Sequence, residues 1–226
     1  MANVVHSLRR MGRQLRQADT RKILIAAVTA ALALGLPTRV WAATPTEELR
    51  QYTDQVLRVM QDSTLTPPAR RAAVRDLAVQ VFDVSETAKR TLGPHWQRRT
   101  PTEREEFVRL FRDLLEQSYV SRIDEYGGER IRYVNEHVDG DSATVRATIV
   151  TRQGAEVPVE SRLLRRGDRW LIYDVLVENV SLVANYRSQF DRIIRTASYE
   201  ELVNRLRNQV QLLMEGKPKP RRPAER

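Results

Sequence analysis

The first part of the chain repeats the hydrophobic spacing of amphipathic helices, and short polar motifs mark where these helices begin. The same four residues, Thr-Pro-Thr-Glu, occur at 44–47 and at 100–103. In each copy the threonine is suited to cap a helix, the proline to lie in its first turn and the glutamate to reach back to the cap. Apolar residues follow at intervals of three and four, which predicts a helix after each motif. A third helix is predicted after Thr66-Pro67, and a shorter one after Ser85.

After residue 130 the period of the apolar positions changes to two, which is typical of half-buried strands. Val145, Ala147 and Ile149 alternate with polar residues, and so do Val159 and the apolar positions around it. Glycine-containing pairs lie between the alternating runs and are typical of hairpin turns. These pairs are at 139–140, 153–154 and 167–168. The pattern predicts a meander of antiparallel strands.

The stretch WLIYDVLVENVSLVANYRSQF, at residues 170–190, passes from a strand pattern to a helix pattern with no glycine or proline between them. Residues 170–180 are apolar on both faces, which favours a fourth strand that is covered on two sides. A helix is then predicted from Ser181 to about Arg195, and a last helix after Ser198. Helices, then strands, then helices predict an α+β fold with a four-stranded, curved antiparallel sheet packed with helices.

The N-terminal residues have the three parts of a signal peptide. Six basic residues precede an apolar run at 23–36, and small residues follow at Ala42 and Ala43. We expect residues 1–42 to be an export signal that is cleaved after Ala42, which would place the protein in the periplasm. The alternative is a membrane anchor, but the run is shorter than the roughly 20 residues that a spanning helix needs.

The net charge of +9 is concentrated at the two ends of the chain. Residues 43–216 carry 26 Lys and Arg against 27 Asp and Glu. A nearly neutral body argues against nucleic-acid binding, which needs a basic face on the domain itself. The segment KPKPRRPAER at 217–226 is rich in proline and poor in apolar residues, which predicts a disordered basic tail. Contact of this tail with anionic lipid or with a partner protein is the alternative. The folded domain is therefore expected to span residues 43–216.

Few residues after position 42 are suited to catalysis. The chain has no cysteine and no HExxH, GxSxG or P-loop motif, and its two histidines in this region, His95 and His137, are expected near turns. Asp174 interrupts the apolar fourth strand. One hypothesis makes Asp174 a buried general base, and the other makes it a structural acid that accepts backbone N–H groups or pairs with an arginine from the following helix. We expect no enzymatic activity, no metal and no cofactor.

The stretch at 170–190 resembles the C-terminal signature of the toluene-tolerance family, the MlaC-like periplasmic phospholipid-binding components of an ABC transport system. The matching residues begin with Trp170, Tyr173 and Asp174 and continue through SLVxNYRSQF at 181–190. Upstream, FDV at 82–84, LGPHW at 92–96 and YGG at 126–128 follow the family's order of landmarks. The resemblance extends over residues 46–212. The long N-terminal basic region and the basic tail depart from the family pattern.

The resemblance implies a carrier that moves phospholipid between an outer-membrane complex and an inner-membrane ABC transporter and so maintains the lipid asymmetry of the outer membrane. Phospholipid would be a cargo, held without covalent chemistry in an apolar cavity between the sheet and the helices. Three alternatives remain: a carrier of hopanoids or other lipids within the same family, a small cavity enzyme that uses Asp174 as a base, and a protein-binding adaptor without a deep pocket.

The cavity implied by the resemblance leads to a set of candidate lipid-binding residues. On the strands, the small side chains of Ala147 and Ser161 would leave room for acyl chains. Arg187 is the candidate for contact with a headgroup phosphate, because guanidinium groups bind phosphate well. A solvated Arg187 and a set of ordinary core residues are the alternatives. The full set of apolar candidates is Phe107, Phe111, Leu114, Leu115, Tyr119, Val145, Ala147, Ile149, Val159, Ser161, Leu163, Leu182, Val183, Tyr186 and Phe190.

Overall fold

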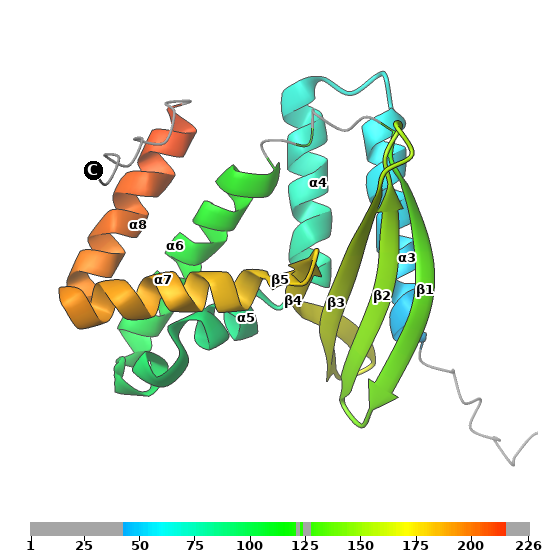
Figure 1. The fold of residues 1–226 in the computed structure, drawn as a ribbon. Helices are drawn as coiled ribbons and strands as arrows, with labels where there is room; N and C mark the ends of the chain where they lie inside the picture. Colours follow the sequence, from blue (N-terminus) through cyan, green and yellow to red (C-terminus); the bar gives the residue numbers. More distant parts are fainter. Residues whose placement is uncertain (1–42, 121–122, 124–127, 216–226) are drawn as a thin grey trace, which may run out of the picture. The chain divides into compact units, whose positions relative to one another are not determined.

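The structure is a computed structural model that describes residues 43–120, 123 and 128–215. The predicted signal peptide at 1–42 and the predicted tail at 217–226 lie outside the described residues. Helices precede and follow the strands, as predicted (Figure 1). The described elements are, in order, α3 (Pro45–Gln61), α4 (Pro67–Val81), α5 (Val84–Leu92), the 3₁₀ helix η1 (Gly93–Arg98), α6 (Pro101–Tyr119), β1 (Arg130–Asp139), β2 (Ser142–Val150), β3 (Glu156–Arg166), β4 (Arg169–Val177), β5 (Val180–Ser181), α7 (Leu182–Thr196) and α8 (Tyr199–Met214).

The helix starts predicted from the two Thr-Pro-Thr-Glu motifs are confirmed. In α3 the Thr44 hydroxyl accepts a hydrogen bond from the Glu47 backbone N–H, and the Glu47 carboxylate accepts one from the Thr44 N–H. Thr100 and Glu103 form the same reciprocal pair at the start of α6. Each pair satisfies N–H groups that have no partner within the helix. These two helices therefore begin where short-range chemistry alone predicts.

The short helix α5 begins slightly earlier than predicted. It starts at Val84, because the side chain of Asp83 accepts the Glu86 backbone N–H and serves as the cap in place of Ser85. Asp83 also bonds to Arg166 near the end of β3, with 2.8 Å between Nε and Oδ2. The cap of α5 is therefore fixed to the sheet as well as to its own helix.

The sheet contains five strands in the order β1-β2-β3-β4-β5, and each neighbouring pair is antiparallel. The prediction of an antiparallel meander is confirmed for the four long strands, and the count of four strands was wrong by one. The turn glycines Gly140, Gly154 and Gly167 all have positive φ. The extra strand, β5, has only two residues, Val180 and Ser181, and pairs with the end of β4.

The passage from β4 to α7 differs from the prediction of a strand that runs directly into a helix. Val177 pairs with Val180, so Glu178 and Asn179 form a two-residue hairpin turn. Both have positive φ, 50° for Glu178 and 65° for Asn179. Such turns normally contain asparagine or glycine, and a glutamate in this conformation costs about 1 kcal/mol. The turn was missed because the pair Glu178-Asn179 contains no glycine, the residue that usually marks such a turn.

Replacing Glu178 by glycine is expected to stabilise the protein. Glu178→Gly should raise the free energy of unfolding by about 0.5–1 kcal/mol, because glycine adopts positive φ without steric cost. The hydrogen bond from the Glu178 backbone N–H to the Pro158 carbonyl is kept by any residue except proline. Asn179→Gly is the matched comparison and should gain less, because asparagine tolerates this conformation. Urea unfolding of both variants measures the difference, and a loss of stability in Glu178→Gly would contradict this description of the turn.

The hydrophobic core of the described residues has two parts. One part lies among α5, α6, α7 and α8 and includes Phe107, Phe111, Phe190 and Leu202. The other lies where α3 and α4 meet the sheet, and it includes Leu49, Val81, Ala143, Val145, Leu163, Trp170 and Ile172. Figure 1 shows α3 along one face of the sheet and α5 to α8 grouped beyond its β4–β5 end. Strand β4 contacts α4, α5 and α7, so it joins the two parts.

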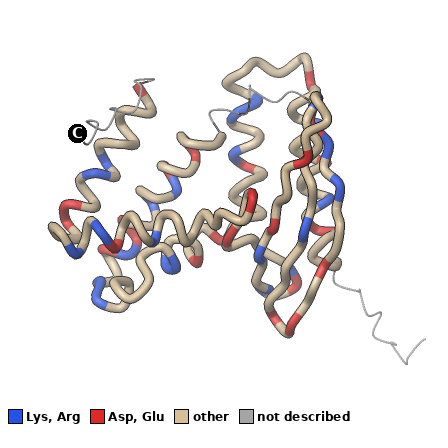
Figure 2. The backbone as a smooth tube through the Cα atoms, in the orientation of Figure 1, with Lys and Arg blue, Asp and Glu red and all other residues tan. Residues whose placement is uncertain are grey.

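The surface of the described part carries both signs of charge. Figure 2 shows lysines and arginines interspersed with acidic residues along the helices and strands, as expected from the near-neutral body. Among the described helices, none combines the length and the hydropathy that crossing a bilayer requires.

Candidate functional site

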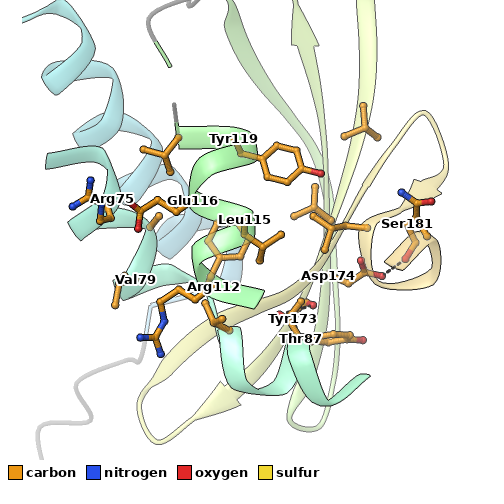
Figure 3. A pocket seen from close by; sticks show the side chains of 18 of the residues that line it. Arg75, Val79, Thr87, Arg112, Leu115, Glu116, Tyr119, Tyr173, Asp174 and Ser181 are labelled. Atoms are coloured by element: carbon orange, nitrogen blue, oxygen red, sulfur yellow. Dashed lines mark hydrogen bonds and ion pairs between the residues drawn. The ribbon is translucent and has the colours of Figure 1, made fainter. Parts of the chain in front are cut away.

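A pocket of about 490 Å³ lies where β4, β5 and the start of α7 face α4, α5 and α6 (Figure 3). This volume is within the range of roughly 300–1,000 Å³ that small-molecule sites occupy. Most of the side chains that line it are apolar. The apolar and aromatic residues of the lining are Ala78, Val79, Phe82, Val84, Leu115, Tyr119, Val120, Tyr173, Val175, Val177, Val180 and Leu182.

Several of these apolar side chains are open to solvent. Val79 on α4 is 56% exposed, Tyr119 on α6 is 55% exposed and Val180 on β5 is 64% exposed. Large apolar side chains that line a cavity and also reach the surface are unusual in a well-filled core. The pocket is therefore accessible from outside, and a ligand that enters it would cover apolar surface now in contact with water.

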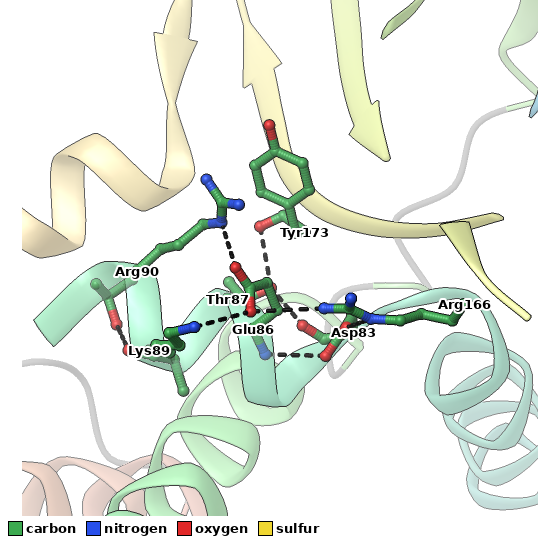
Figure 4. A network of polar contacts seen from close by, with 9 residues as sticks. Asp83, Glu86, Thr87, Lys89, Arg90, Arg166 and Tyr173 are labelled. Atoms are coloured by element: carbon green, nitrogen blue, oxygen red, sulfur yellow. Dashed lines mark hydrogen bonds and ion pairs between the residues drawn. The ribbon is translucent and has the colours of Figure 1, made fainter. Parts of the chain in front are cut away.

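The helix α5 is held against β4 by a network of polar contacts (Figure 4). The Thr87 hydroxyl donates to the Tyr173 carbonyl at 3.0 Å, and Glu86 pairs with Arg90 at 2.8 Å and with Arg166 at 3.5 Å. The Arg90 guanidinium also lies over the Tyr173 ring, 4.0 Å from its centroid. These contacts fix the lower wall of the pocket, to which Val84 and Thr87 contribute.

Asp174 is buried, lines the pocket and accepts a hydrogen bond at each carboxylate oxygen. Its Oδ1 accepts the Val183 backbone N–H at 3.0 Å, and its Oδ2 accepts the Ser181 hydroxyl at 2.7 Å. Arg162 on β3 lies 3.7 Å from Oδ2. This is the arrangement of the structural acid, with the arginine coming from β3 instead of the following helix. The carboxylate joins β4 to the first turn of α7.

The described residues contain no cluster of three or more His, Cys, Asp or Glu side chains that could hold a metal ion. His95 pairs with Asp191 on α7, with 2.9 Å between Nε2 and Oδ1, and the hydrogen bond from His95 holds the pKa of the Asp191 carboxyl below its usual value. This pair lies outside the residues that line the pocket.

Of the fifteen apolar candidates from the sequence, Leu115, Tyr119 and Leu182 line the pocket. The other helical candidates belong to packed regions. Phe107, Phe111, Leu114 and Phe190 are buried in the helical core. The aromatic rings there, which include that of Tyr186, pack edge to face, stacked or tilted, with 5.2–6.0 Å between centroids. Burial raises the pKa of Tyr186 above its ordinary value. Val183 is buried at the start of α7.

The strand candidates lie on β2 and β3, and two of them, Val159 and Ser161, pair with the lining residues Val177 and Val175 of β4. Val145 and Leu163 are buried in the core between the sheet and α3. Val145 pairs with Ser161, and Ala147 pairs with Val159. Ile149, Ala147, Val159 and Ser161 are half-buried and none of them is among the lining residues. The helices α4, α5 and α7 contact β4, whereas α3 contacts β1, β2 and β4 and belongs to the packed core beside the sheet.

Arg187 does not lie in the apolar pocket. It is exposed on α7 and lines a separate, more polar pocket of about 540 Å³ together with Lys89, Arg90 and Arg162. Its guanidinium packs against Gly93, where a Cβ atom would come within 2.8 Å of the Arg187 Nε. The two pockets share Tyr173, Asp174 and Ser181 in their linings.

The sequence predicts that the fourth strand and the following helix form one corner of the cavity, but no residue of α4 or β4 was named as a lipid-binding candidate. Ala78, Val79 and Phe82 come from α4 and its end, and Val175 and Val177 come from β4. The sequence contained one signal for β4. Residues 170–180 are apolar on both faces, which indicates that apolar groups cover the strand on both sides. The signal for Val79 was that it is an apolar residue outside the stripe of α4 that faces the core.

Comparisons with known proteins identify relatives over most of the described residues. The chain is 21% identical over 141 residues to the intermembrane phospholipid transport system binding protein MlaC of Haemophilus influenzae, an alignment that covers 60% of this chain and just under two thirds, 66%, of that protein. It also resembles in fold the structure of the phospholipid-binding protein from Ralstonia solanacearum in complex with a phospholipid. That comparison has a TM-score of 0.68 and 21% identity, and it covers 76% of this chain and 99% of the other.

The family model described as MlaC protein matches residues 50–208. This range includes all of α4 to α7 and most of α3 and α8, and thus every element that lines the apolar pocket. Because the match extends over well more than half of the sequence, the chain belongs to the MlaC protein family.

Proposed function

We propose that this protein is a soluble periplasmic carrier that binds phospholipid and holds its acyl chains in the apolar pocket between β4 and α4–α7. The observation that carries the proposal is an accessible pocket lined mainly by apolar side chains, in a member of the MlaC family. The resemblance in fold to a protein solved with a bound phospholipid supports it.

The driving force for loading would be the transfer of hydrocarbon from water into the pocket. Each methylene buried contributes about 0.8 kcal/mol, so a single long acyl chain supplies several kcal/mol without any covalent bond. Exposed apolar side chains such as Val79 and Val180 would lose contact with water in the same step. A carrier of this kind needs neither a cofactor nor a catalytic residue.

The proposal extends to the partners. The Haemophilus influenzae relative is named as the binding protein of an intermembrane phospholipid transport system. By analogy, this protein would exchange phospholipid with an outer-membrane complex and an inner-membrane ABC transporter and so maintain the lipid asymmetry of the outer membrane. The predicted signal peptide at 1–42 would deliver it to the space between the two membranes.

The geometry of Asp174 argues against a cavity enzyme. A general base directs a carboxylate oxygen toward the substrate. Both carboxylate oxygens of Asp174 are directed toward contacts that hold β4 to α7, one with the Ser181 hydroxyl and one with the Val183 backbone N–H. No second acid lines the pocket near it, since Glu116, the other acidic lining residue described, pairs with Arg75.

A transfer assay tests the proposal. Donor vesicles with fluorescent phosphatidylethanolamine are mixed with unlabelled acceptor vesicles, and the protein is added in catalytic amounts. The protein is expected to accelerate transfer in proportion to its concentration and to carry labelled lipid with it through gel filtration. Transfer no faster than in vesicles alone, with no lipid in the protein fraction, would contradict carriage and leave the adaptor alternative. If the protein transferred a labelled hopanoid between vesicles but not phospholipid, its cargo would be hopanoid.

A further inference from the structure

The apolar pocket has charged groups of opposite character at its two ends (Figure 3). Arg75, Glu116 and Arg112 lie at the end formed by α4 and α6. Asp174 and Ser181 lie at the end formed by β4, β5 and α7. The first end holds two cations and one anion, and the second holds one buried anion. A ligand with one negative group and apolar tails would therefore not bind equally well with its negative group at either end.

At the α4–α6 end, one arginine is engaged and the other is available. Arg75 reaches from α4 to Glu116 on α6, with 2.5 Å between Nε and Oε1. Arg112 is one turn before Glu116 on α6 and is exposed. Among the described residues, no acidic side chain forms an ion pair with the Arg112 guanidinium. The end therefore has a local charge of +1, which matches the single negative charge of a phosphodiester.

The other end offers a phosphate no cationic side chain among the described lining residues, and Asn185 is its neutral donor. The Asp174 carboxylate is buried there, accepts the Ser181 hydroxyl and lies 3.7 Å from Arg162, which does not line this pocket. The Ser181 oxygen also accepts the Ala184 backbone N–H at 2.9 Å, and its one proton is directed to Asp174 and not to a ligand. Glu178 in the adjoining turn adds a second negative charge. The exposed lining residues near it, Val177 and Val180, are apolar.

We propose that the phosphate of the bound lipid contacts Arg112 at the α4–α6 end of the pocket, with the acyl chains directed toward Val175 and Val177. This inference rests on the proposed function, and it adds the orientation of the cargo and the group that recognises its phosphate. A guanidinium donates two parallel hydrogen bonds to phosphate oxygens. Exposed Val79, which lies beside both arginines in Figure 3, would then cover the first methylenes of the tails.

The test compares two ligands with identical tails. Dipalmitoylphosphatidylglycerol carries the phosphodiester and dipalmitoylglycerol lacks it, and each is supplied to lipid-free protein in the same detergent. Arg112→Gln is expected to weaken binding of the phosphatidylglycerol by about three- to tenfold, a modest factor because the site is exposed, and to leave dipalmitoylglycerol binding unchanged. Arg109→Gln is the matched control. Arg109 is exposed on the same helix and pairs with Asp113 outside the pocket, so this variant should bind both ligands as the unmodified protein does.

The remaining outcomes separate this inference from the proposed function. Equal affinity of Arg112→Gln and the unmodified protein for phosphatidylglycerol overturns the role of Arg112, and so does an equal loss for both ligands. Failure of the unmodified protein to bind either ligand overturns the carrier function itself. Titration with inorganic phosphate alone is expected to show no saturable binding. Saturable binding that Arg112→Gln removes would assign the site to free phosphate and overturn the inference for lipid.

Discussion

Ala78→Trp is expected to reduce the amount of phospholipid that copurifies with the protein by at least about tenfold. Ala78 is the smallest side chain in the apolar lining and projects from α4 into the pocket. An indole at this position would fill part of the 490 Å³ and obstruct the space through which an acyl chain would pass. Overpacking into an existing void costs less than overpacking a filled core, so the fold should be retained. Lipid extraction followed by mass spectrometry measures the occupancy.

The control adds the same side chain to the same helix outside the pocket. Asp76 is exposed on α4 and does not line the pocket, so Asp76→Trp should keep its lipid. Circular dichroism and the midpoint of thermal unfolding verify that both variants are folded. Normal lipid content in a folded Ala78→Trp variant would show that the acyl chains lie elsewhere.

Asp174→Ala is expected to lower the free energy of unfolding by about 3 kcal/mol. The substitution removes two hydrogen bonds and leaves the Val183 N–H and the Ser181 hydroxyl without their partner at a buried junction. Loss of one member of such a buried polar group costs several times the net value of an ordinary hydrogen bond. Denaturant unfolding measures the change. Ser181→Ala, which removes one of the two contacts and the α7 cap, should cost about 1 kcal/mol.

Asp174→Asn separates the structural role from a catalytic one. The amide retains an oxygen that can accept one of the two hydrogen bonds, so the loss of stability should be smaller than in Asp174→Ala. A carrier with this substitution should retain its lipid, because the tails contact the apolar lining. A stable Asp174→Asn variant that had lost all lipid would contradict the assignment of Asp174 to the joint between β4 and α7.

The parts of the fold that could be predicted depend on contacts between residues close in sequence. The caps at Thr44 and Thr100 need only a glutamate three residues later, and both formed as predicted. The hairpin turns at Gly140 and Gly167 depend on glycine, which adopts positive φ at low cost. The turn at Glu178-Asn179 is also a two-residue hairpin turn, but both of its residues have positive φ and neither is glycine, and so β5 was not predicted.

The location of the pocket could not be predicted, because periodicity shows which side chains point inward but not what they meet. Val145 and Leu163 point inward as expected, yet α3 packs against them and fills the space. Phe111 and Phe190 follow the helical stripes correctly and fill the core among α5 to α8. Whether an inward side chain borders a cavity depends on the distance between elements, which long-range packing decides.

The three candidates that line the pocket share a position in the fold that the sequence did not show. Leu115, Tyr119 and Leu182 lie at positions where α6 and α7 face β4 across a gap. Arg112 was missed for a related reason. An arginine on a helix is usually solvated, and only the position of Glu116, engaged by Arg75 from α4, shows that Arg112 is the free cation among the described residues at this end.

The most direct test of the account locates the acyl chains by crosslinking. The protein is loaded with a phosphatidylethanolamine that carries a photoreactive diazirine on one acyl chain, irradiated and digested, and the labelled residues are identified by mass spectrometry. The account predicts labels on α4, α6 and β4, at residues such as Val79, Leu115 and Val175. Labels concentrated on β2, at Ala147 or Ile149, or the absence of any specific label would contradict it.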